Sequence, residues 1–87
     1  MGPAPPVDGD RELARLRWRC RRGMKELDTL LVRYLDGRYR AADPADQGRF
    51  RELLELQDPE LAAFVLGRAV PEDAELARFI QRLVQPA

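Results

Sequence analysis

The chain has 87 residues, of which 45% are hydrophobic and 34% are charged, and 15 basic residues balance 15 acidic residues. A chain of this length forms one domain at most and buries about 60–65% of its unfolded surface, which leaves little room for an enclosed active site. The absence of histidine excludes acid–base catalysis and metal sites that depend on imidazole. A net charge of zero argues against a general polyanion binder.

The charges are nevertheless unevenly distributed along the chain. Residues 11–25 hold seven basic residues against one acid, whereas residues 43–75 hold nine acids against three arginines. Such a dipole favours orientation on a charged partner more than bulk attraction.

The expected compartment is the cytoplasm. The first residues, MGPAPPVDGD, lack the basic region and apolar core of a signal peptide, and no apolar run approaches the ~18–20 residues that a membrane span requires. The single cysteine, Cys20, excludes an intrachain disulfide and suits a reducing environment. We therefore expect no membrane insertion.

Residues 1–10 contain three prolines, two glycines and two aspartates, which predicts a flexible arm ahead of a single helical domain over residues 11–87. From Arg11 the pattern is helical, with an apolar stripe of Leu13, Leu16 and Cys20. On this stripe Cys20 is interpreted as a small core residue rather than a nucleophile. Trp18 lies off the stripe and is expected to be half-exposed or packed against a neighbouring element.

The next segment, from Met24 to about Gly37, has the best-formed amphipathic pattern in the chain. Its apolar positions are Leu27, Leu30, Leu31, Tyr34 and Leu35. Gly23 precedes it as a residue just past a helix end, where glycine accepts the left-handed conformation without steric cost. Gly37 is the predicted stop.

Three further helix starts follow, each marked by proline next to acidic residues. Asp43-Pro44 and Asp58-Pro59-Glu60 have the form of an N-cap before a proline in the first turn, and Pro71 with Glu72 and Asp73 is predicted to open the last helix, which Pro86 ends. The expected inward positions are Phe50, Leu53 and Leu54, then Leu61, Phe64 and Val65 before Gly67, and finally Leu76, Phe79, Ile80, Leu83 and Val84. The predicted fold is a compact all-α array of five helices.

Candidate chemistry is sparse. The aspartate pairs Asp8/Asp10 and Asp43/Asp46 have the oxygens for a hard cation but are more simply a solvated tail and a helix cap, so no metal site is predicted. The basic segment leaves an alternative open, a small helical regulator that binds nucleic acid through Arg15, Arg17, Trp18, Arg19 and Arg22. An antitoxin-like or oligomeric adaptor is a further alternative without a motif of its own.

The most informative stretch is Arg22-Gly23-Met24-Lys25-Glu26, an RGxxE arrangement. In an unbroken helix Gly23 would cost about 1 kcal/mol relative to alanine, while the Arg22–Glu26 pair would return at most about 0.5 kcal/mol. If Gly23 is instead a joint, Arg22 caps the negative end of one helix and Glu26 lies at the positive end of the next. A bare glycine between opposite charges would also let a partner backbone approach closely. On physical grounds the joint and the docking surface are equally supported, and they are compatible.

These residues also carry a family resemblance. RWRCRRGMKELD, FRELLELQDPELAAFVLG and PEDAELARFIQRL resemble the small five-helix assembly factors of succinate dehydrogenase that promote covalent flavinylation, over about residues 15–84. The chain departs from the family where relatives often have a tryptophan in the fourth helix, since it has Phe64.

The resemblance implies a non-enzymatic partner of the flavoprotein subunit of succinate dehydrogenase, or of fumarate reductase. It implies that FAD belongs to that subunit, that the chain holds no cofactor stably, and that nucleic acid is not its ligand. The motif residues Arg22, Gly23 and Glu26 would meet the flavoprotein, with Arg21 and Asp28 flanking them. Asp58 and Glu60 match the acidic start of the fourth helix and are a candidate second surface for the partner.

Overall fold

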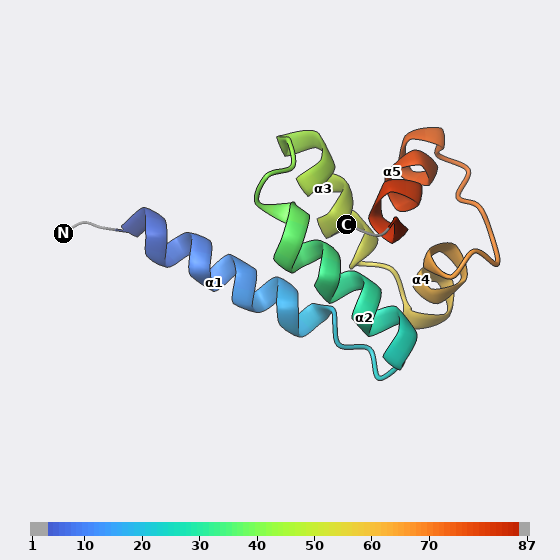
Figure 1. The fold of residues 1–87 in the computed structure, drawn as a ribbon, viewed down its shortest axis with the longest axis horizontal. Helices are drawn as coiled ribbons and strands as arrows, with labels where there is room; N and C mark the ends of the chain where they lie inside the picture. Colours follow the sequence, from blue (N-terminus) through green and yellow to red (C-terminus); the bar gives the residue numbers. More distant parts are fainter. Residues whose placement is uncertain (1–3, 86–87) are drawn as a thin grey trace.

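Five α-helices and one π-helical turn make up the described part of the chain, which contains no strand (Figure 1). The computed structural model describes the backbone of residues 4–85 and the side chains of residues 11–85. In chain order the elements are α1 (Ala4–Arg19), α2 (Lys25–Tyr34), η1 (Leu35–Tyr39), α3 (Pro44–Leu53), α4 (Asp58–Val65) and α5 (Ala74–Val84). The predicted all-α array of five helices is confirmed.

The core is assembled from the apolar stripes of all five helices. The Tyr34 ring lies 5.0 Å from that of Phe50 and 5.3 Å from that of Phe79 between centroids, which joins α2 to α3 and α5. The predicted positions that are buried are Leu16, Cys20, Leu27, Leu31, Tyr34, Leu35, Phe50, Leu53, Leu54, Leu61, Val65, Phe79, Ile80 and Leu83. The remaining predicted positions, Leu13, Leu30, Phe64, Leu76 and Val84, are partly buried against this cluster.

Helix α1 begins at Ala4, ahead of the predicted start at Arg11. It therefore includes residues 4–10 of the stretch expected to be a flexible arm, and residues 1–3 of that stretch lie outside the described residues. Pro5 and Pro6 fall in the first helical turn, where no intrahelical acceptor is available and a missing N–H costs nothing. Figure 1 shows that the N-terminal turns of α1 project away from the other helices, so the core does not back them.

The predicted stop at Gly37 is wrong. Gly37 lies inside the π-helical turn η1 and does not have a positive φ, so it is not a left-handed cap. The chain stays helical to Tyr39, whose ring is buried and lies 5.5 Å from Phe50 between centroids. The Gln47 Nε2 also donates a hydrogen bond to the Tyr39 carbonyl at 2.8 Å. Burial of this tyrosine therefore outweighs the tendency of glycine to end the helix.

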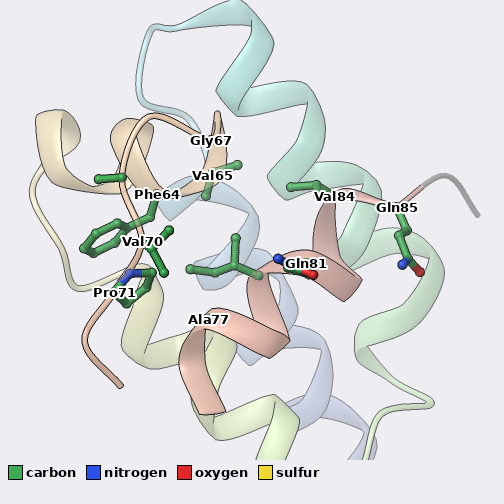
Figure 2. A pocket seen from close by; sticks show the side chains of 11 residues that line it. Phe64, Val65, Gly67, Val70, Pro71, Ala77, Gln81, Val84 and Gln85 are labelled. Carbon is green, nitrogen blue, oxygen red and sulfur yellow. The ribbon is translucent and has the colours of Figure 1, made fainter. Parts of the chain in front are cut away.

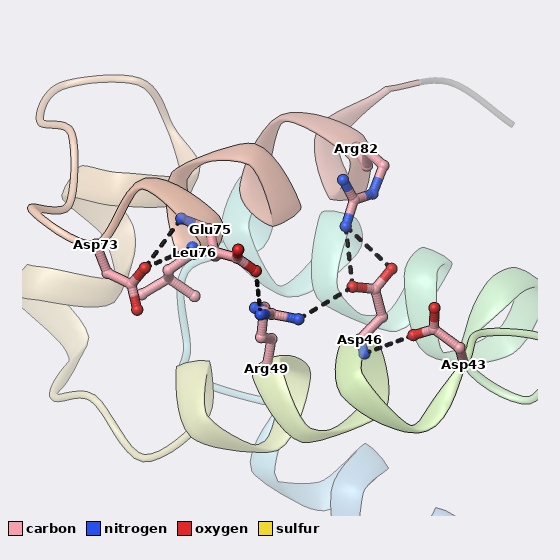
Figure 3. Close-up of polar contacts among 7 residues, drawn as sticks. All are labelled: Asp43, Asp46, Arg49, Asp73, Glu75, Leu76 and Arg82. Carbon is pink, nitrogen blue, oxygen red and sulfur yellow. Dashed lines mark hydrogen bonds and ion pairs between the residues drawn. The ribbon is translucent and has the colours of Figure 1, made fainter.

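The predicted opening of the last helix at Pro71 is also wrong, because α5 begins only after Asp73. The Asp73 carboxylate accepts the backbone N–H groups of Glu75 at 2.9 Å and Leu76 at 3.4 Å (Figure 3). Since this side chain satisfies the first N–H groups, the N-cap is Asp73 and the preceding residues are a loop. Pro86, the predicted end, lies outside the described residues.

The start of α3 at Asp43-Pro44 is confirmed, since the Asp43 carboxylate accepts the Asp46 N–H at 2.9 Å. Arginines surround the Asp46 carboxylate, with Arg82 Nη2 at 2.9 Å and Arg49 Nη1 at 3.6 Å (Figure 3). Arg49 also pairs with Glu75 of α5. Of the aspartates considered as cation ligands, Asp43 therefore serves as a helix cap and Asp46 as the centre of an ion-pair network between α3 and α5, while the side chains of Asp8 and Asp10 lie outside the described residues.

Two glycines provide a matched test of these backbone conformations. Gly67 has φ +81°, whereas Gly37 is helical, and a Cβ added to either would meet no atom within 4 Å. Gly37→Ala is therefore expected to raise the free energy of unfolding by about 0.4–1 kcal/mol, because it restricts the unfolded chain without strain. Gly67→Ala is expected to lower it by about 1 kcal/mol or more, because alanine disfavours positive φ. Urea unfolding followed by circular dichroism measures both, and equal signs for the two variants would contradict the assigned conformations.

Candidate partner-docking surface

Gly23 is a joint between two helices. Helix α1 ends at Arg19, α2 begins at Lys25, and Gly23 between them has φ +81°. The Asp28 carboxylate, in the first turns of α2, folds back over the joint and accepts the Arg22 N–H at 2.9 Å and the Gly23 N–H at 3.1 Å. One carboxylate at the positive end of α2 thus fixes two consecutive peptide groups of the turn. The joint interpretation of the RGxxE stretch is confirmed.

The Arg22 side chain holds this joint onto the rest of the protein. Its Nε donates to the Arg19 carbonyl at 2.7 Å, which caps the C-terminal end of α1 as expected. Its two Nη atoms reach the turn between α3 and α4. There they donate to the carbonyls of Leu54 and Leu56, the latter at 2.9 Å, and to the Asp58 carboxylate at 3.0 Å. Only 13% of the side chain is exposed, so the guanidinium is an internal clamp between three segments.

The outer face of the joint consists of residues that the clamp does not use. Arg21, Gly23 and Glu26 are all exposed, and a Cβ added to Gly23 would meet nothing within 4 Å. Among the described side chains, none forms a hydrogen bond or ion pair with the Glu26 carboxylate or the Arg21 guanidinium. A shallow hollow beside them, on the first turns of α2, is lined by Lys25, Glu26, Thr29 and Leu30.

The five predicted site residues therefore divide into two groups. Arg22 and Asp28 point their polar groups inward and position the turn, while Arg21, Gly23 and Glu26 face solvent. Asp58 is brought to the motif by its contact with Arg22 and is the first residue of α4, whereas Gln57 occupies the N-cap position. Asp58 is therefore not the N-cap that its sequence pattern indicated. Glu60 is exposed on the same helix.

The sequence did not predict how far Trp18 is exposed. Its side chain is 75% exposed, so it is neither half-buried nor packed against a neighbouring element. It borders a hollow between the end of α1 and the turn that follows α3, which is lined by Trp18, Arg19, Arg21, Arg22, Leu54, Glu55, Leu56 and Gln57. The only signal for this position in the sequence was its place off the apolar stripe.

Ion pairs within the chain occupy much of the basic segment considered for nucleic acid. Arg17 pairs with Asp36, Arg22 pairs with Asp58, and Arg19 lies 4.0 Å from Glu55. These acids neutralise arginines that would otherwise track phosphates. Three of the four arginines named for the nucleic-acid alternative therefore lie next to an acid of the same chain.

A third hollow lies between α4, the loop that follows it and α5 (Figure 2). The side chains that line it are apolar apart from Gln81 and Gln85, and none is charged. Within residues 11–85, no three carboxylate or thiol groups gather in a way that would hold a metal ion. No helix in the described part of the chain is both long enough and apolar enough to cross a membrane.

The Cys20 thiol is fully buried, and the prediction that it is a core residue is confirmed. Burial raises its pKa from the ordinary value of 9.0 to about 11, because removal from water disfavours the thiolate. The nearby guanidinium groups of Arg22 and Arg17 act in the opposite direction but do not offset the burial.

Fold and surface together define a small all-α protein that presents an exposed glycine joint flanked by charged side chains. A family model described as "Flavinator of succinate dehydrogenase" matches residues 14–87. The chain belongs to this family, as the sequence resemblance indicated.

Relatives from several bacteria bear the name "FAD assembly factor SdhE". The protein of Pseudomonas aeruginosa is 46% identical over 78 residues, which cover 86% of this chain and 93% of the relative. That of Colwellia psychrerythraea is 46% identical over 72 residues, covering 83% and 79%, and that of Shewanella oneidensis is 47% identical over 68 residues, covering 78% and 83%. No solved structure matches the chain.

The clamp can be tested with two adjacent arginines. Arg22→Ala removes charge-assisted hydrogen bonds from partly buried acceptors and is expected to lower the free energy of unfolding by about 2–3 kcal/mol. Arg22→Lys should recover only part of this loss, because an ammonium group cannot reproduce the planar fork. Arg21→Ala is the matched control and should change the stability little. Urea unfolding measures all three, and an Arg22→Ala variant as stable as the control would contradict the clamp.

The burial of Cys20 can be tested by alkylation. At pH 8 the raised pKa of Cys20 leaves less than about 1% of the thiol as the reactive thiolate. The surrounding core also blocks access of the reagent to the sulfur. We expect iodoacetamide to leave the native protein unlabelled under conditions that label it fully in urea, as measured by intact mass. Native labelling at the rate of a free cysteine would contradict the core position.

Proposed function

We propose that this protein is an FAD assembly factor. It binds the flavoprotein subunit of succinate dehydrogenase, or of fumarate reductase, and promotes covalent attachment of FAD to a histidine of that subunit. It acts in the cytoplasm without being an enzyme itself, and the FAD is held by the partner. The family description and the names of the relatives support this proposal.

The observation that carries the proposal is the open outer face of the joint. At Gly23 a partner backbone could approach without meeting a side chain, because the space around the missing Cβ is empty. Beside it the Glu26 carboxylate offers acceptors and the Arg21 guanidinium offers donors, and neither is engaged by the described side chains. A glycine between unpaired opposite charges is a surface suited to hydrogen bonds with a partner.

The inner residues of the motif act by holding that face in place. Asp28 fixes the peptide groups of Arg22 and Gly23, and Arg22 ties the turn to Asp58. A surface that is ordered before binding loses less conformational entropy when the partner docks. We therefore assign Gly23, Glu26 and Arg21 to contact with the flavoprotein and Arg22, Asp28 and Asp58 to positioning. Glu60, exposed on α4, remains a candidate for a second contact.

Binding alone is sufficient for an assembly role. Covalent attachment requires the flavin and the acceptor histidine to be correctly placed, and both belong to the partner. A helper that binds the reactive conformation of the flavoprotein more tightly than its other conformations raises the population of that conformation. This mechanism requires no catalytic side chain from the helper, in keeping with a chain that lacks histidine.

The test is co-expression of the chain with the flavoprotein subunit from the same organism, with covalent flavin read as fluorescence in a denaturing gel. Gly23→Arg should abolish covalent flavin and binding while leaving the helical circular dichroism signal near that of the wild type. Arginine places bulk and charge where the partner backbone would approach. Undiminished flavinylation would overturn the proposal.

Gly67→Arg is the matched control, because Gly67 has the same φ of +81° and equally open surroundings. Both substitutions strain the backbone by about 1–2 kcal/mol, which corresponds to a fall in Tm of about 4–16 °C for a domain of this size. We expect the two variants to lose similar stability and only Gly23→Arg to lose flavinylation. If flavinylation falls equally in both, Gly23 is a structural joint and not a contact.

A further inference from the structure

We propose that Trp18 and Arg21 form a second contact with the flavoprotein subunit and receive a segment that carries a carboxylate next to an apolar side chain. This inference rests on the proposed function. It extends the interface beyond the RGxxE residues to the hollow at the end of α1.

The starting observation is the exposure of Trp18, the only tryptophan of the chain. Its side chain is 75% exposed at the C-terminal end of α1, although Leu16 and Cys20 on either side of it are buried. An indole is among the most apolar and rigid groups that a surface can present, and tryptophan and arginine are the residues that most often dominate binding energy at interfaces. Trp18 therefore has the character of an interface anchor.

The hollow beside Trp18 is held by the same clamp as the joint. The residues that line it include Leu54 and Leu56, whose carbonyls accept hydrogen bonds from the Arg22 guanidinium. The wall of the hollow and the Gly23 turn are therefore fixed relative to each other. A partner that recognises one of them finds the other already in position.

The electrostatics of the hollow select an acidic ligand. Arg21 is exposed, and no described side chain pairs with it. Arg19 makes a 4.0 Å contact with Glu55, and the side chains of these residues are 42% and 67% exposed respectively. Of the three arginines that line the hollow, Arg22 pairs with Asp58 and Arg19 lies 4.0 Å from Glu55, which leaves Arg21 without a described partner. A carboxylate of the partner would pair with Arg21 and complete its hydrogen bonding.

The size of a protein interface connects this hollow to the flavoprotein. A specific interface buries about 800 Å² on each partner and involves about 20–30 residues a side, far more than Gly23 and Glu26 supply. A partner seated on Gly23 also covers Arg21, which is two residues away and shared with the hollow. Among the described residues, the large hydrophobic residues that are exposed are Trp18 and Val70, and Trp18 is the one that shares a hollow with Arg21.

The single tryptophan makes the contact directly observable. The chain labelled with 5-fluorotryptophan gives one ¹⁹F resonance, which comes from Trp18. We expect this resonance to shift and broaden when the unlabelled flavoprotein subunit is added and binds. Trp18→Ala and Arg21→Glu should each raise the dissociation constant by about 10-fold or more without lowering the Tm.

Two exposed residues on other parts of the chain supply matched controls. Val70→Ala removes an apolar side chain that is 79% exposed, and Arg78→Glu makes the same charge reversal on α5. Neither should change the dissociation constant more than about twofold. Equal weakening by Arg21→Glu and Arg78→Glu would mean general charge attraction and would overturn the inference.

The remaining outcomes separate this inference from the proposed function. If Trp18→Ala and Arg21→Glu bind like the wild type while Gly23→Arg does not, the inference fails together with the contact assigned to Arg21, and the assembly function with docking at Gly23 stands. If Gly23→Arg also binds like the wild type, both fail. A shift of the ¹⁹F resonance that depends on the concentration of the chain alone would assign the hollow to a second copy and would likewise overturn the inference.

Discussion

The Arg22 guanidinium is the contact on which the arrangement of this small protein most depends. It joins the last carbonyl of α1 to the turn between α3 and α4, across more than 30 residues of sequence. A core of this size leaves little surplus stability, and α1 contributes few apolar residues to it. A single partly buried side chain that satisfies several backbone acceptors can therefore fix the first helix where the core does little to hold it.

The clamp also explains how one short motif serves both structure and recognition. A glycine at positive φ is a weak point unless neighbouring groups fix it, and here Asp28 and Arg22 provide that support from inside the molecule. The support comes entirely from one side, so the other side of Gly23 stays open. The two interpretations of the RGxxE stretch thus describe opposite faces of the same turn.

The helical pattern was readable from the sequence because it depends on neighbours three or four residues apart, as in the stripe of Leu27, Leu31 and Tyr34. The errors fell where a distant partner decides the outcome. Gly37 stays helical because Tyr39 is buried against Phe50, and a local pattern does not contain that contact. The inward direction of Arg22 was missed for the same reason, since its acceptors lie 32 to 36 residues away. The joint at Gly23 was predicted correctly because helix ends are marked locally.

These contacts show that the basic and acidic segments of the chain partly pair with each other in the fold. Basic residues 11–25 and acidic residues 43–75 are separated in sequence, but Arg19 and Arg22 fold onto Glu55 and Asp58 at the end of α3 and the start of α4. Pairing of this kind neutralises some of the charges at the surface. The charged groups without a partner among the described side chains include Arg21 and Glu26, which lie on either side of Gly23 in the sequence. In a chain with no net charge, recognition then rests on the short-range placement of these groups, because at physiological salt an exposed charge acts over only about 8 Å.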